Sequence, residues 1–69
     1  MTEGSTQLSD SERTCLHLAA RGKSVEAIAS HLDDYPGKIE TLFASIRKKL
    51  LANTIVEAIA RALRSGLIE

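Results

Sequence analysis

Residues 24–50 read SVEAIASHLDDYPGKIETLFASIRKKL and contain two helical patterns separated by a turn. Ser24 suits a helix N-cap, and the apolar residues after it recur at the i, i+3, i+4, i+7 spacing of one buried stripe. Pro36 suits the first position of a second helix. The two stripes are Val25, Ile28, Ala29 and Leu32, then Ile39, Leu42, Phe43, Ile46 and Leu50. We therefore expect one helix from 24 to about 33 or 34 and another over 36–50. A connection of about three residues is typical of a helix-turn-helix, whose second helix enters the DNA major groove.

A third helical pattern precedes this pair. Ser9 and Glu12 have the spacing of a capping box, in which each side chain accepts the other residue's backbone N–H. The helix should run to about Arg21, with Gly22 in the left-handed cap position. Its expected inward residues are Cys15, Leu16, Leu18, Ala19 and Ala20.

The last helical pattern covers about 55–65, between a second capping box formed by Thr54 and Glu57 and a cap at Gly66. Both sides of this helix are apolar. We expect Val56, Ile59, Ala60 and Leu63 to face inward, which leaves a second apolar flank formed by Ile55, Ala58 and Ala62. Because a small core cannot cover both sides, we interpret that flank as a dimer interface.

Composition limits the chain to one small domain. The 69 residues are 43% hydrophobic and 26% charged, with one proline, which favours a compact helical domain over a disordered or β-rich one. The formal net charge is zero, but six of the nine basic residues lie in 35–69. Residues 1–7 are expected to be a disordered tail and 8–69 the domain. This leader lacks the features of a signal peptide and the single cysteine cannot form an internal disulfide, so we expect a cytoplasmic protein with no membrane partner.

Leu8 to Ile68 resembles the LuxR-type (GerE-type) DNA-binding domain. The family's opening Leu-Thr-x-x-Glu and Leu-x-Leu-x-Ala-x-Gly-x-Ser correspond here to Leu8, Ser9, Glu12, Leu16, Leu18, Ala20, Gly22 and Ser24. Later matches are Ala27, Ile28 and Ala29, then Ile46, Lys49 and Leu50, then the run from Glu57 to Leu63 with Gly66, Leu67 and Ile68. The resemblance implies an all-α, four-helix LuxR-type helix-turn-helix domain, here standing alone, that dimerises through its last helix.

The predicted DNA-binding residues lie mainly on the helix that starts at Pro36. They are Lys23, Lys38, Glu40, Thr41, Ser45, Arg47, Lys48 and Lys49. Two positions depart from the family pattern, which usually has Lys and His where this chain has Glu40 and Leu42. Glu40 repels phosphate but can accept a hydrogen bond from cytosine. We predict no catalytic residues, metal site or cofactor, since no nucleophile–base arrangement or ligand cluster occurs.

Two functions follow from these residues. The first is a transcription regulator that binds double-stranded DNA sequence-specifically as a homodimer. The alternative is a protein-interaction module of the same fold, an anti-activator that has lost DNA binding and binds a LuxR-type or other transcription regulator. Glu40, Leu42 and the acidic pair Asp33 and Asp34 motivate this alternative.

Overall fold

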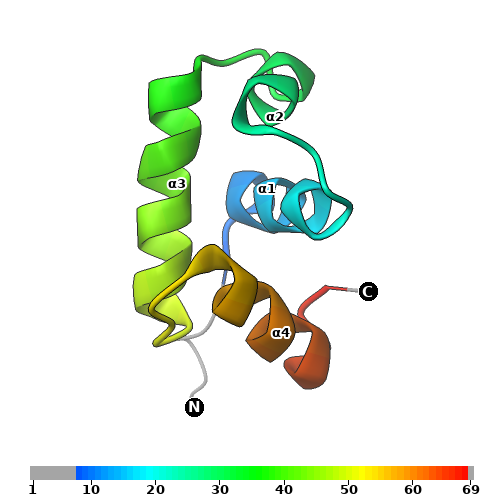
Figure 1. The fold of residues 1–69 in the computed structure, drawn as a ribbon, viewed down its shortest axis with the longest axis vertical. Coiled ribbons are helices and arrows are strands. Elements are labelled where there is room, and N and C mark those ends of the chain that lie inside the picture. The colour runs from blue at the N-terminus through cyan, green and yellow to red at the C-terminus, as the bar shows by residue number, and fades with distance from the viewer. Residues whose placement is uncertain (1–7, 69) are drawn as a thin grey trace.

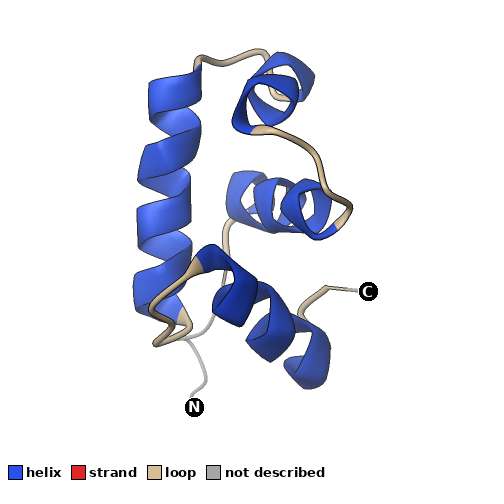
Figure 2. Cartoon of the chain, in the orientation of Figure 1, coloured by secondary structure: helices blue, strands red, loops and turns tan. Residues whose placement is uncertain are grey.

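A computed structural model describes residues 8–68, which form four α-helices (Figure 1). The helices are α1 (Asp10–Ala20), α2 (Val25–His31), α3 (Pro36–Lys49) and α4 (Ile55–Ser65). No β-strand occurs within the described residues (Figure 2). The expected all-α, four-helix fold is thus confirmed. The tail predicted over 1–7 lies outside the described residues.

The helices begin at the expected capping residues. Ser9 Oγ accepts a hydrogen bond from the Glu12 backbone N–H at 3.1 Å, and Glu12 Oε1 accepts one from the Ser9 N–H at 2.9 Å. Ser24 Oγ accepts from the Ala27 N–H at 3.1 Å, and Pro36 is the first residue of α3. These side chains satisfy donors that the helix itself leaves free, which fixes where each helix starts.

The cap of α4 differs in one detail from the expected capping box. Thr54 Oγ1 accepts from the Glu57 N–H at 3.0 Å as expected, but the Glu57 carboxylate accepts from the N–H of Asn53, at 2.9 Å. The reciprocal bond therefore reaches the residue before the N-cap. Glu57 also forms an ion pair with Arg61, one turn further along α4, at 3.0 Å.

All four helices end in the same way, with a left-handed residue that reverses the chain. This residue is Gly22 after α1, Asp33 after α2, Leu51 after α3 and Gly66 after α4, with φ between 56° and 85°. In each case a backbone N–H after the helix donates to a carbonyl five residues earlier. These donor–acceptor pairs are Lys23 and Leu18, Asp34 and Ala29, Ala52 and Arg47, and Leu67 and Ala62. α2 consequently ends at His31, before the expected Asp33 or Asp34, because Asp33 takes the left-handed conformation.

The hydrophobic core lies between α3 and the other three helices. α3 is the longest helix and packs against α1, α2 and α4, which are stacked along one side of it in Figure 1. Both expected stripes of the helix-turn-helix face inward. The largest fully buried side chains are Leu16, Ile28, Ile39, Ile46 and Cys15. The core therefore fixes which side of α3 is left outside.

The faces of α4 differ from the prediction at most positions, although Ile59 is partly buried against the core as expected. Ala58 and Ala62, expected outside, are fully buried, and Ile55 is partly buried against the core. Val56 and Leu63, expected inside, are 72% and 49% exposed. The spacing could not separate the faces because both are apolar. The small alanines face α1 and α3, and their size allows the helix backbones to approach closely.

Leu51 provides a test of the backbone geometry at the end of α3. Its left-handed φ of 56° is unfavourable for a residue with a Cβ, and its side chain is 82% exposed and contributes little packing. We expect Leu51→Gly to stabilise the fold by about 0.5–1 kcal/mol, because relief of strain exceeds the extra entropy of glycine in the unfolded chain. Thermal unfolding should show a midpoint about 3–6 °C higher. Leu51→Ala keeps the Cβ and is the matched control; an equal gain from it would contradict the strain argument.

Candidate nucleic-acid interface

The turn between α2 and α3 sets the direction in which α3 leaves the core. Asp34 Oδ1 accepts a hydrogen bond from the Tyr35 N–H at 2.9 Å, directly before Pro36 opens α3. The Asp34 carboxylate thus lies near the positive end of the α3 dipole, which favours it. Ile28 of α2 and Ile39 of α3 are both fully buried, so the two helices share one part of the core. The short turn and this packing hold α3 in a fixed orientation against α2.

One row of residues faces outward along α3. Gly37, Thr41, Ala44 and Lys48 are all exposed, and their spacing of four, three and four places them on a single face. Three of the four are small. The Thr41 hydroxyl donates to the Gly37 carbonyl at 3.1 Å, so its oxygen remains available as an acceptor. A double helix could therefore approach the α3 backbone closely along this row.

An exposed cation lies at each end of α3. Lys38 lies in the first turn and Lys48 in the last, and both are exposed. Lys48 follows Lys38 by ten positions, which corresponds to about 15 Å along the helix axis. That length is comparable with the width of the DNA major groove, about 12 Å. Arg47, half-buried, shares a flank with the exposed Glu40, seven residues earlier, so an acid and a base lie on the same side of α3.

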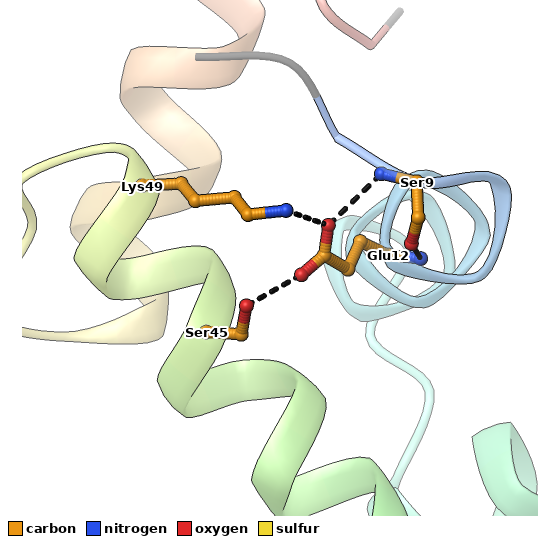
Figure 3. Close-up of polar contacts among 4 residues, drawn as sticks. All are labelled: Ser9, Glu12, Ser45 and Lys49. Atoms are coloured by element: carbon orange, nitrogen blue, oxygen red, sulfur yellow. Dashed lines mark hydrogen bonds and ion pairs between the residues drawn. The ribbon is translucent and has the colours of Figure 1, made fainter. Parts of the chain in front are cut away.

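A buried carboxylate joins α1 to α3 (Figure 3). Glu12 is only 4% exposed. Its Oε1 accepts from Lys49 Nζ at 2.7 Å, and its Oε2 accepts from the Ser45 hydroxyl at 2.6 Å. With the Ser9 N–H, three donors reach one carboxylate. The capping box accounts for Glu12 in the sequence, and nothing in that local pattern indicates its bonds to α3.

These bonds separate the predicted DNA-binding residues into two groups. Ser45 and Lys49 lie on the flank of α3 that faces α1, where Glu12 binds both. Because Ser45 and Lys49 lie beside α1, they do not belong to the outward row. The exposed members of the predicted set are Lys23, Lys38, Glu40, Thr41 and Lys48. Lys23 lies outside α3, in the loop between α1 and α2.

The environment of Glu12 determines its protonation. Burial by itself would raise the pKa of this carboxyl group. Hydrogen bonds from Lys49, Ser45 and the Ser9 backbone, together with the charge of Lys49, outweigh burial and lower the pKa from 4.5 to about 2. Glu12 is therefore ionised at neutral pH, and a buried negative charge is fully paired. A role as a catalytic acid would need the opposite shift.

Other kinds of site receive no support from the described residues. Cys15 is fully buried, and burial followed by the nearby Glu12 charge raises the pKa of its thiol to about 11, so it is not a reactive thiolate. Within residues 8–68, no group of three or more His, Cys, Asp and Glu residues is arranged to hold a metal ion. The helices in this range are also too short or too polar to cross a membrane.

Comparison with known proteins adds one finding. The family model described as "Bacterial regulatory proteins, luxR family" matches residues 6–62, which is well over half of the chain. The match covers α1, α2, α3 and the first part of α4. A search of curated proteins found no match.

The Glu12 ion pair should make stability depend on pH in a defined window. Because the pKa is lower in the folded chain than its ordinary 4.5, the contribution is complete above about pH 4.5 and is lost as the pH falls toward 2. The full shift corresponds to about 3 kcal/mol. Urea unfolding at several pH values should show this loss for the wild type. Glu12→Gln should lower stability at neutral pH and flatten the slope. Glu57→Gln is the control, because Glu57 is a surface carboxylate whose pKa the Asn53 N–H and Arg61 also lower. This variant keeps Glu12 and should keep the loss of stability that Glu12 causes. An unchanged slope in Glu12→Gln would refute the assignment of this pH dependence to Glu12.

Proposed function

Since this chain belongs to the LuxR family of bacterial regulatory proteins, a family of DNA-binding helix-turn-helix regulators, we propose that it regulates transcription by binding double-stranded DNA through α3 as a homodimer. The observation that carries this proposal is the outward row of α3, with Lys38 near one end and Lys48 at the other. A helix with small residues at its centre and cations at its ends fits a groove bordered by phosphates.

The α3 residues divide by the kind of contact that they would make. Lys48 and Arg47, at the end of α3, supply phosphate contacts. Lys23 contacts the DNA sugar-phosphate backbone from the α1–α2 loop. Lys38, Glu40 and Thr41 lie in the first half of α3 and supply base contacts. Lysine donates to guanine, a carboxylate accepts from the cytosine amino group, and threonine suits either kind of edge. In this arrangement Glu40 contributes to specificity rather than to affinity.

Ser45 and Lys49 have a different part in this proposal. Their bonds to Glu12 hold the inner flank of α3 against α1 and so orient the outward row. They are positioning residues, and their loss should affect stability before it affects DNA contacts. The Glu12 charge offsets that of Lys49, so the net positive charge that α3 offers to phosphate comes mainly from Lys38, Arg47 and Lys48.

The proposed dimer interface is the outer face of α4. Val56, Ala60 and Leu63 are exposed and lie four and three residues apart, which places them on one face. This face replaces the predicted set Ile55, Ala58 and Ala62, whose two alanines are buried within the protomer. Burial of Val56 and Leu63 against a second copy would remove apolar surface from water. Two α3 helices joined in this way could read two half-sites, which compensates for the few phosphate contacts of one protomer.

DNA binding can be tested by fluorescence anisotropy with duplex DNA at about 50 and 200 mM salt. We expect binding that weakens steeply with salt. Lys48→Ala should weaken binding and reduce the salt slope by about 0.9 per protomer, since one phosphate contact is lost. Arg64→Ala is the matched control, because it removes an exposed cation from α4 and should leave the slope unchanged. Absence of binding at the lower salt would contradict the proposal and favour the protein-interaction alternative.

The dimer can be tested separately by sedimentation velocity over a range of protein concentrations. Val56→Glu or Leu63→Glu should shift the chain to a monomer, because a charge buried in an apolar interface is strongly unfavourable. Both side chains are exposed in the protomer, so the helix content should be retained. Ser11→Glu adds the same charge at an exposed site in the first turn of α1 and serves as the control. An unchanged monomer–dimer equilibrium in both α4 variants would rule out this interface.

A further inference from the structure

A groove of about 520 Å³ lies between α1, the end of α2 and the segment that follows α4. Its walls include Arg13 and His17 of α1, Arg21 directly after α1, His31 of α2 and Leu67 after α4. None of the residues that line the groove belongs to α3. The proposed DNA contacts make no use of it.

The charge in this groove has one sign. Arg13, His17 and Arg21 are spaced four residues apart and form a single basic ridge along α1, which His31 faces from α2. No aspartate or glutamate lines the groove. The nearest acidic partner of the ridge is Asp10, which lies 3.7 Å from Arg13 and is fully exposed, so this contact is weak. Arg13 and Arg21 therefore carry positive charge that no acidic residue within the groove offsets.

The floor of the groove is apolar. Leu18 and Leu67 are partly buried against the core, and Ile68 is almost fully buried. The volume lies within the range of about 300–1,000 Å³ that is typical of small-molecule sites. Such sites combine an apolar lining with a few polar groups that fix the ligand's orientation. Arginine is the side chain best suited to bind a carboxylate or phosphate group through two parallel hydrogen bonds.

From these features we propose that the groove binds a small amphipathic organic anion. Its oxyanion group, a carboxylate or a phosphate monoester, pairs with Arg13, Arg21 and the histidine N–H groups. Its apolar body rests on Leu18 and Leu67. The site is formed by one protomer and does not depend on the proposed DNA binding or on the α4 dimer.

The proposal can be tested on the full chain, without DNA, by titration of amide resonances in NMR spectra. The probes are phenyl phosphate and benzoate, which share an apolar ring and differ in the oxyanion. We expect at least one of them to shift the amides of Thr14, His17, Gly66 and Leu67, which line or adjoin the groove. Benzyl alcohol lacks the charge and inorganic phosphate lacks the ring, so both should bind at least about tenfold more weakly.

The double substitution Arg13→Gln/Arg21→Gln should weaken binding of the responsive probe by about tenfold or more. The matched control is Arg61→Gln/Arg64→Gln, which removes the same charge from α4 and should change the affinity less than about twofold. Circular dichroism should show that both variants keep the helical fold. Equal weakening by the two variants, unchanged affinity in Arg13→Gln/Arg21→Gln, or shifts confined to Val56 and Leu63 would overturn the proposal. So would a duplex oligonucleotide that shifts the same amides, since the groove would then be a DNA-backbone site.

Discussion

A single buried carboxylate ties α1 to the inner flank of α3 and adds directional bonds to the apolar packing that orients α3. Glu12 belongs to the first turn of α1, yet its two oxygens hold Ser45 and Lys49, which lie 33 and 37 residues further along the chain. A carboxylate with 4% exposure is tolerated only when its charge is compensated, and here a lysine, a hydroxyl and a backbone N–H compensate it. Apolar contacts are non-directional, whereas these hydrogen bonds have a preferred geometry and so favour one register of α1 against α3. The direction of the outward row follows from that register.

Local features of the fold could be predicted from the sequence, because their causes are local. Ser9, Ser24 and Pro36 begin helices in the structure as predicted, and Gly22 and Gly66 adopt the left-handed caps. The apolar stripe predicted to be buried on α3 is also buried or partly buried in the structure, because the other side of this helix is too polar to be buried. The exception is the end of α2, where Asp33 takes a conformation that the pattern assigned to helix. Aspartate adopts this conformation more often than most non-glycine residues, but the apolar spacing that defined α2 does not report it.

Contacts between distant segments could not be predicted in the same way. Glu12 already had a sufficient local explanation in its capping box, and nothing in the spacing of Ser45 and Lys49 indicates which helix lies beside them. The inward face of α4 was predicted wrongly for a different reason, because Val56 and Ala58 lie on two apolar faces of the same helix. Periodicity identifies a face only when the opposite face is polar. The packing of α4 against α1 and α3 buries Ala58 and Ala62 and leaves Val56 and Leu63 exposed.

The two faces of α4 also differ in how freely they can vary during evolution. Ala58 and Ala62 are fully buried, so a larger side chain at either position would push the helix away from its neighbours. The outer positions, such as Val56 and Leu63, meet no such restriction within the protomer. Substitutions in a lineage should therefore accumulate on the outer face, where they alter association and leave the protomer intact. Divergence of partners among duplicated copies of this domain would then require few changes, all of them on the same side of one helix.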